Sequence, residues 1–151
     1  MIHFEGDRTF PLPVEAVAAQ LGDAGFLVGC LEGVERVVET GPDRAVWTLR
    51  TGFSFLSATL EVTLTVTERS SAGAKFRAAS KGVGASSLVE AALTFAPTGS
   101  GTTVHYVADM VERTGFLKVV SSGLIQSAAK SVIDDTWKAI EKKLTVTSPA
   151  A

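Results

Sequence analysis

GFLKVVSSGLIQSAAKSVIDDTWKAIEKKL, residues 115–144, is the segment on which the architecture of this chain depends most. It contains no proline, and its apolar residues recur at intervals of three and four, which is typical of a helix lying on an apolar surface. In the first half the positions that set this spacing are Leu117, Val120, Leu124 and Ala128. Thr114 is suited to capping the first turn. We therefore predict one long amphipathic helix from Gly115 to Leu144.

The two halves of this predicted helix differ in composition. Small residues gather in the first half, whereas Trp137, Ile140 and Leu144 give the second half its bulk. The apolar stripe also moves around the helix axis, as contact with a twisted sheet requires. Its later positions are Ile125, Ala129, Val132, Ile133, Ile140 and Leu144. We expect the first half to allow close approach or empty space, and the second half to pack tightly.

Before this helix, from Gly33 onward, the apolar residues alternate with polar ones, which indicates β-strands. The clearest strand is Ala58–Glu68, where leucine and valine alternate with threonine and glutamate. The other alternating segments are Val34–Glu39, Ala45–Thr51, Ala74–Lys81, Ser86–Ala96 and Thr102–Val111. Short linkers such as Gly41-Pro42-Asp43 join them, so we expect successive strands to pair as antiparallel hairpins.

The N-terminal part supplies one more strand and two short helices. Ile2–Phe10 alternates as a strand does, and the prolines that follow end it. Val14–Leu21 has helical spacing after a proline, and Asp23–Cys30 can form a second short helix capped by its aspartate. The predicted class is therefore α+β: a curved antiparallel sheet whose apolar concave face is covered by the last helix.

Composition narrows the possible functions. The chain has 151 residues, of which 46% are hydrophobic and 20% charged, with a formal net charge of −2. These values indicate one folded domain and make nucleic acid an unexpected partner. The single cysteine, Cys30, excludes an internal disulfide, and the first residues do not resemble a signal peptide. We expect a cytoplasmic protein.

The element order and several short motifs resemble the G-subunit family of carbon monoxide dehydrogenase, within the START-like (SRPBCC, helix-grip) superfamily. The motifs are Phe4-Glu5-Gly6, residues 10–17 (FPLPVEAV), Leu21-Gly22-Asp23, residues 29–35 (GCLEGVE) and Val132-Ile133-Asp134-Asp135. The resemblance implies a helix-grip fold, in which a seven-stranded sheet wraps around a long C-terminal helix and two short helices separate the first two strands. We expect this START-like domain to span residues 1–144, with a frayed tail over 145–151.

The same resemblance implies a function. It indicates a cavity between sheet and helix for a lipophilic small molecule, lipid or quinone-like, in an accessory protein of a carbon monoxide dehydrogenase-like molybdenum enzyme. Such a protein has dehydrogenase subunits and a membrane surface as further expected partners, which would place it peripherally at a membrane.

Large apolar side chains on the inward face of the predicted sheet exceed what a partly small-residue helix can cover, which favours a cavity. The candidate ligand-binding residues are Trp47, Phe53, Phe55, Leu60, Leu64, Phe76, Leu93, Phe95, Tyr106, Met110, Val120 and Leu124. An ordinary packed core is the alternative interpretation, and the chain would then be a protein-interaction module.

Two segments are candidates for a lid or a gate at the cavity. Residues 52–57 (GFSFLS) place Phe53 and Phe55 between two predicted strands, where they form either a lid or docking loop at the cavity edge or an extension of the core. Gly115 and Gly123 would weaken the first half of the long helix, so we hypothesise a gate there.

Catalytic interpretations have less support in the sequence. A polyketide cyclase-like START enzyme would need acid–base groups inside the cavity, and the inward faces offer few. Cys30 with His3 or His105 lacks any motif of a nucleophile and base, so we expect a buried, inert thiol. His105, Glu90 and Asp109 share a face predicted to be solvated. We predict no enzyme activity, no catalytic residue, no cofactor and no metal.

Overall fold

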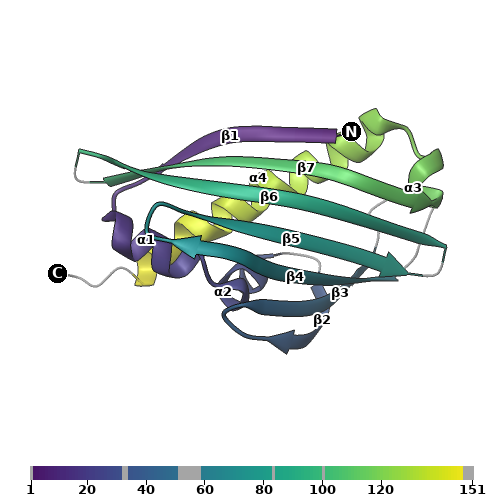
Figure 1. Cartoon of the computed structure of the whole chain (residues 1–151), viewed down its shortest axis with the longest axis horizontal. Coiled ribbons are helices and arrows are strands. Elements are labelled where there is room, and N and C mark those ends of the chain that lie inside the picture. The colour runs from purple at the N-terminus through teal and green to yellow at the C-terminus, as the bar shows by residue number, and fades with distance from the viewer. Residues whose placement is uncertain (1, 32–33, 51–58, 83, 100, 148–151) are drawn as a thin grey trace.

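The computed structural model describes residues 2–31, 34–50, 59–82, 84–99 and 101–147 (Figure 1). The strands are β1 (Ile2–Phe10), β2 (Val34–Thr40), β3 (Arg44–Arg50), β4 (Thr59–Ser70), β5 (Gly73–Gly82), β6 (Ala85–Thr98) and β7 (Gly101–Gly115). The helices are α1 (Val14–Leu21), α2 (Ala24–Gly29), α3 (Phe116–Val119) and α4 (Ser122–Thr147). The strands form a seven-stranded antiparallel sheet in the order β1-β7-β6-β5-β4-β3-β2. The predicted α+β architecture is confirmed.

The alternation in the sequence determines which face of the sheet is buried. In β4, Leu60 and Val62 are buried, whereas Thr59 and Glu61 are exposed. Successive strands from β2 to β7 pair as antiparallel neighbours, and β1 forms the edge of the sheet beside β7, pairing with it from Ile2↔Met110 to Phe10↔Thr102. All inward apolar faces therefore lie on one side of the sheet.

The two short helices form where the sequence predicts them. Pro13 precedes α1, and Asp23 caps α2 by accepting a hydrogen bond from the Phe26 backbone N–H at 3.1 Å. α2 then docks on the β2–β3 turn, because the backbone N–H of Ala24 donates to the carbonyl of Pro42 at 2.9 Å.

Arg69, near the end of β4, connects the α1–α2 junction with the β2–β3 turn. Its Nε donates to the carbonyl oxygen of Gly22, at the α1–α2 junction, at 2.8 Å. Its two terminal nitrogens reach the β2–β3 turn, one bonding the Pro42 carbonyl oxygen and the other pairing with the Asp43 carboxylate, both at 2.7 Å. We call this set the Arg69 bridge.

The prediction of one continuous helix from Gly115 to Leu144 is wrong at its start. Thr114 does not cap a helix, because β7 continues through it and pairs it with Ser86. Gly115 then turns the chain with a φ of +64°, and α3 follows as a separate short helix. A new start occurs at Ser121, whose Oγ accepts a hydrogen bond from the Leu124 backbone N–H at 3.2 Å. At the other end, α4 reaches Thr147, beyond the expected end at Leu144.

α4 crosses the concave side of the sheet diagonally, from the end where β7 leaves the sheet to the end near α1 (Figure 1). Its C-terminal half packs as predicted: Trp137, Ile140 and Leu144 are buried in the main core. That core also contains Phe10, Val17, Leu21, Cys30, Phe76, Phe95 and Val104. The opposite end of α4 is held by a separate small cluster of Ile2, Val120 and Ile125.

The first half of the helix is rotated relative to the predicted stripe. Ile125 is buried, whereas Leu124 is 41% exposed and the small residues Gly123, Ser127 and Ser131 face solvent. The small residues therefore do not provide close approach to the sheet. The empty space beneath α4 therefore does not come from these small residues.

Candidate functional site: the apolar cavity beneath α4

A cavity of about 300 Å³ lies between the concave face of the sheet and the middle of α4, and it is partly open to solvent. Its sheet-side wall comes from strands β3 to β7 and includes Trp47, Leu64, Phe76, Ala78, Ala91, Leu93, Tyr106 and Ala108. The remaining wall comes from the helical side and includes Leu21, Leu27, Leu31, Val132, Ile133, Thr136, Trp137 and Ile140. None of these lining side chains carries a charge.

The space exists because α4 is anchored at its two ends while small side chains line the sheet below its middle. Ala91 and Ala108 are directly opposed across β6 and β7, and Ala78 adds a third short side chain on β5. Alanine has no atoms beyond Cβ, so these inward positions leave volume that leucine or phenylalanine would fill. The cavity is a consequence of inward alanines between large neighbours.

Aromatic rings define one end of the cavity. The ring centroids of Tyr106 and Trp137 are 5.3 Å apart, and Phe10 lies behind Trp137 at 6.1 Å. The Arg8 guanidinium sits 5.9 Å from the Tyr106 ring and 6.0 Å from the Trp137 ring, and its Nη2 is 3.4 Å from the Asp134 carboxylate. Arg8 therefore brings a paired charge to this end without entering the wall.

The structure brings together five of the predicted ligand-binding residues in the cavity wall: Trp47, Leu64, Phe76, Leu93 and Tyr106. The other described candidates lie outside the cavity wall. Leu60 is buried away from the wall, Phe95 belongs to the main core, and Leu124 is exposed. Met110 and Val120 pack in the small cluster around Ile2.

The remaining predicted positions, Phe53 and Phe55 in the 52–57 segment, lie outside the described residues. Sequence reasoning missed the contributions of α1, α2 and the middle of α4, such as Leu21, Leu27 and Thr136. The inward alternation of Ala78, Ala91 and Ala108 was the signal that could have located the empty space.

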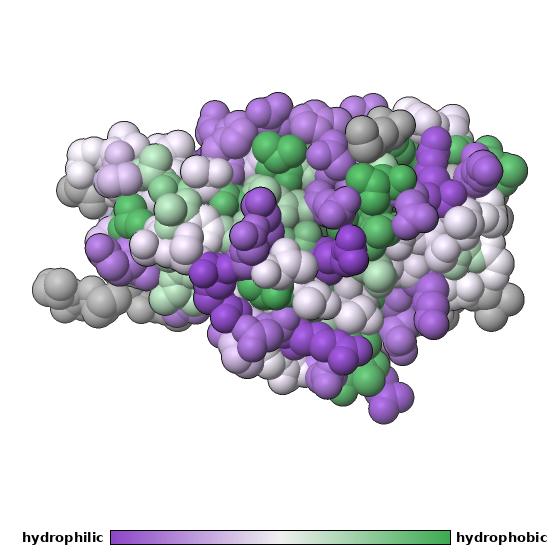
Figure 2. Space-filling view, viewed as in Figure 1, coloured by the Kyte–Doolittle hydropathy of each residue, from purple (hydrophilic) through white to green (hydrophobic). Residues whose placement is uncertain are grey.

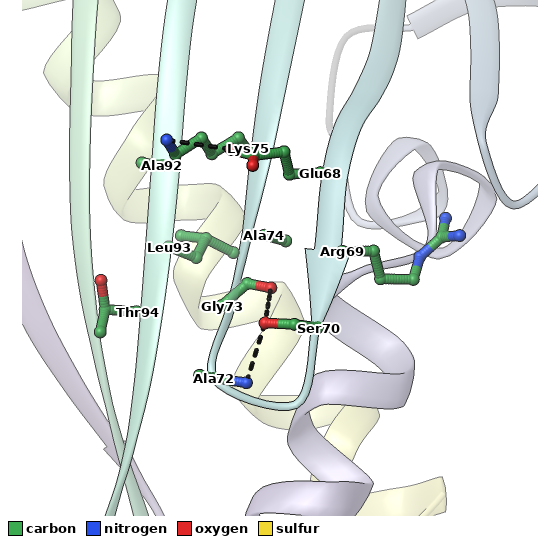
Figure 3. A pocket seen from close by; sticks show the side chains of 10 residues that line it. All are labelled: Glu68, Arg69, Ser70, Ala72, Gly73, Ala74, Lys75, Ala92, Leu93 and Thr94. Atoms are coloured by element: carbon green, nitrogen blue, oxygen red, sulfur yellow. Dashed lines mark hydrogen bonds and ion pairs between the residues drawn. The ribbon is translucent and has the colours of Figure 1, made fainter.

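A second hollow, of about 340 Å³, lies at the β4–β5 turn and is lined by mixed residues (Figure 3). Its polar groups bond to one another: Lys75 pairs with Glu68 at 2.9 Å, and the Ser70 hydroxyl bonds the Gly73 carbonyl and the Ala72 N–H. Arg69 points away from the hollow, into the Arg69 bridge. This arrangement stabilises a turn and leaves little to recognise a ligand.

The outer face of the sheet mixes hydrophilic and hydrophobic side chains (Figure 2). On β1 and β7 it carries a network in which His3 contacts Asp109 at 2.6 Å and Glu5 at 3.2 Å, while His105 contacts Asp7 at 2.7 Å and Glu5 at 3.0 Å. Hydrogen bonds to these carboxylates raise the pKa of both histidines. Both rings are exposed, in line with the predicted solvated face.

Cys30 lies in the main core, on the opposite side of the sheet from both histidines. Burial raises the pKa of its thiol, which disfavours the reactive thiolate. Among the described residues, no group of histidine, cysteine and carboxylate side chains is arranged to hold a metal ion. Within the same ranges, no helix has both the length and the apolar composition that crossing a membrane demands.

The order of elements and the sheet wrapped over α4 define a START-like helix-grip fold, with the cavity between sheet and helix. A family model for the G subunit of carbon monoxide dehydrogenase (CoxG) matches residues 6–145, and the chain belongs to this family. Both parts of the predicted resemblance are confirmed.

Solved structures show the same fold at low sequence identity. A conserved protein from Geobacillus kaustophilus superposes with a TM-score of 0.82 at 20% identity, over 97% of each chain. A START superfamily protein from Mycobacterium smegmatis gives 0.67 at 12% identity, covering 97% of this chain and 99% of that one. The Zhui aromatase/cyclase from Streptomyces gives 0.57 at 14% identity, covering 94% and 90%. Among curated proteins, no match is found.

Proposed function

We propose that this protein binds a lipophilic small molecule, lipid or quinone-like, in the cavity beneath α4. The observation that carries the proposal is the cavity itself: about 300 Å³ of space whose described wall consists of apolar and aromatic side chains without a charged group. A pocket of this kind, with few polar groups, is the usual form of a small-molecule site. Apolar surface on a ligand would gain free energy by leaving water for this wall.

We further propose that binding, without chemistry, is the activity. Among the described residues, the hydroxyl groups in the wall belong to Tyr106 and Thr136, and the Thr136 hydroxyl already donates to the Val132 carbonyl at 2.7 Å. A cyclase-like reaction needs positioned acid and base groups at the reacting atoms. The paired histidines and carboxylates lie on the other face of the sheet, where they cannot serve this cavity.

Membership in the CoxG family supports a place for the chain as an accessory protein of a carbon monoxide dehydrogenase-like molybdenum enzyme. A carrier with an apolar cavity suits such an enzyme when a lipophilic molecule must reach it from, or leave it for, a membrane. Genes for a molybdenum hydroxylase beside the gene for this chain would support the assignment, and their absence would oppose it.

Native mass spectrometry of the purified protein, with and without added quinones or fatty acids, tests the binding proposal. Ala78→Phe places a ring in the cavity, whereas Ala79→Phe places the same ring on the outer face of the same strand. We expect the wild type and Ala79→Phe to bind and Ala78→Phe to lose binding. The proposal fails if no lipophilic molecule copurifies or binds the wild type below about millimolar concentration.

A further inference from the structure

Gly6 occupies an inward position of β1, between the inward side chains of Phe4 and Arg8. Its register partner is Tyr106 on β7, the strand that lies beside β1 (Figure 1). A Cβ at Gly6 would lie 2.8 Å from the Tyr106 hydroxyl oxygen and 2.9 Å from the ring atoms Cε1 and Cζ. The Tyr106 ring therefore lies directly over the backbone of Gly6, as aromatic rings do when they cover a glycine on a neighbouring strand.

Two further side chains confine the Tyr106 ring. The Trp137 ring centroid lies 5.3 Å from the centroid of Tyr106, and the Arg8 guanidinium lies 5.9 Å from it. Arg8 is itself held by its ion pair with Asp134. Tyr106 also lines the cavity beneath α4. Among the described surroundings, the cavity is therefore the side toward which the ring is free to move.

The absence of a side chain at Gly6 decides where the Tyr106 ring can lie. Carbon atoms in contact are about 3.5–4.0 Å apart, so a methyl group at position 6 would push the ring away by about 0.6–1 Å. Because side chains in protein interiors are close-packed, such a displacement takes its room from the adjacent empty space, which is the cavity. Glycine at this position thus keeps the Tyr106 end of the cavity open.

We propose that Gly6 is a specificity-determining residue, which sets the length of the apolar chain that the cavity accepts by letting the Tyr106 ring lie back against β1. Gly6 itself does not belong to the described cavity wall, so it acts through Tyr106. This inference rests on the proposed binding function and adds a limit on the size of the ligand. It also gives a role to the glycine of the Phe4-Glu5-Gly6 motif.

The test uses straight-chain alkanols, from hexanol to tetradecanol, as probes. Quenching of tryptophan fluorescence gives each dissociation constant, since Trp47 and Trp137 line the cavity. Each added methylene group should tighten binding about fourfold until the chain fills the cavity. We call the chain length at which this gain stops the limiting length. We expect Gly6→Ala to bind the short alkanols as the wild type does and to shorten the limiting length by one or two carbons.

Two controls separate this effect from a general loss of packing. Gly41→Ala should leave the limiting length unchanged, because a Cβ at Gly41 would lie at an ordinary contact distance of 3.5 Å from the Arg44 carbonyl oxygen, in the β2–β3 turn. Tyr106→Leu removes the ring atoms that a methyl group at position 6 would meet. Adding Gly6→Ala to Tyr106→Leu should therefore not change the limiting length further.

An unchanged limiting length in Gly6→Ala, or an equal weakening of every alkanol, would overturn the inference while the binding function stands. A Gly6→Ala protein that does not fold would overturn it too, because the Tyr106 ring then has no room to retreat into the cavity. If no alkanol binds the wild type, the role of Gly6 in ligand length fails, and native mass spectrometry with quinones and fatty acids decides the binding function separately.

Discussion

The Nδ1 atom of His105 lies 2.7 Å from a carboxylate oxygen of Asp7, its register partner across β1 and β7. The same relation repeats nearby, because His3 and Asp109 are also register partners and their side chains meet at 2.6 Å. Each pair joins the edge strand β1 to β7 through side chains as well as through the backbone ladder.

These pairs predict a pH dependence of stability. The pKa of both histidines is raised from its ordinary value of 6.5, first by the hydrogen bond to Asp7 for His105 and to Asp109 for His3. A raised folded-state pKa stabilises the fold fully below the unfolded value and loses that contribution as pH rises through the folded value. Urea unfolding should therefore show a decline in stability that begins near pH 6.5 and continues above it.

Nuclear magnetic resonance titration of the two imidazoles measures the cause directly. Asp7→Asn should return the pKa of His105 toward its ordinary value, and Asp109→Asn should do the same for His3. Because both rings are exposed, high salt should reduce the shifts in the wild type. Wild-type histidines that titrate at or below 6.5 would contradict the prediction.

The Arg69 bridge predicts that the free energy of unfolding depends on one guanidinium group. Arg69→Ala removes bonds to Gly22, Pro42 and Asp43 together. The Gly22 carbonyl loses the Arg69 donor, whereas the Pro42 carbonyl keeps its bond from the Ala24 backbone N–H. Hydrogen bonds to charged groups contribute about 1.5–3 kcal/mol when protected, and partial exposure of Arg69 lowers this, so we expect a loss of about 1–2 kcal/mol in the free energy of unfolding.

Arg77→Ala is the matched control for this measurement. Arg77 is exposed on the neighbouring strand and its contact with Glu90 is long, at 3.7 Å, so its removal should change stability by less than about 0.5 kcal/mol. Arg69→Lys should recover little, because an ammonium cannot reach three acceptors in the planar geometry of a guanidinium. Equal losses of stability at Arg69 and Arg77 would show that the Arg69 bridge does not stabilise the contact between the α1–α2 junction and the β2–β3 turn.

Gly115 predicts a large effect from a single methyl group. Its φ of +64° is strained for other residues, and a Cβ there would meet the backbone carbonyl oxygen of Gly84. Gly115→Ala should therefore lower the free energy of unfolding by about 2 kcal/mol or more, as measured by urea titration.

Gly123→Ala is the contrasting substitution, since Gly123 lies in the first turn of α4 and a Cβ there would meet no atom within 4 Å among the described residues. It should leave stability unchanged or raise it by up to about 1 kcal/mol. Of Gly115 and Gly123, only Gly123 lies in a helix, so the gate hypothesis now rests on Gly123 alone. If Gly123→Ala leaves ligand exchange unchanged in a binding-competent protein, the gate hypothesis fails.

The sequence predicts the sheet well because strand alternation is a local property. Leu60 and Val62 face the core and Thr59 and Glu61 face water, as their order requires. The start of the last helix was not predictable in the same way. Thr114 can cap a helix or extend a strand, and its pairing with Ser86, far away in the chain, decides between them.

The cavity shows a similar limit. The sequence places Phe76, Leu93 and Tyr106 on the inward face, and the structure finds them in the wall. Leu124 and Ile125 are adjacent and equally apolar, so only packing against Ile2 shows that Ile125 is the buried one. How far α4 stands from Ala91 and Ala108 depends on its two anchored ends, which no local pattern encodes.

Val132 predicts where a ligand enters. It lines the cavity and is nevertheless 53% exposed, so it lies where the wall meets solvent. Val132→Lys should add a charge at this opening with little effect on stability, within about 0.5 kcal/mol, because the side chain is already exposed. Apolar ligands should then associate more slowly and bind more weakly, since they must pass or displace a hydrated ammonium.

Leu124→Lys is the matched control for Val132→Lys, because Leu124 is 41% exposed on the same helix and is absent from the cavity wall. Both variants change net charge equally, so any general effect of charge on ligand partitioning cancels between them. Stopped-flow measurement of the quenching of tryptophan fluorescence follows association, since Trp47 and Trp137 both line the cavity. Slower association in Val132→Lys alone supports entry beside Val132. Equal association rates in the two variants would place the opening elsewhere along α4, because every ligand that enters must pass a charge placed at the true entrance.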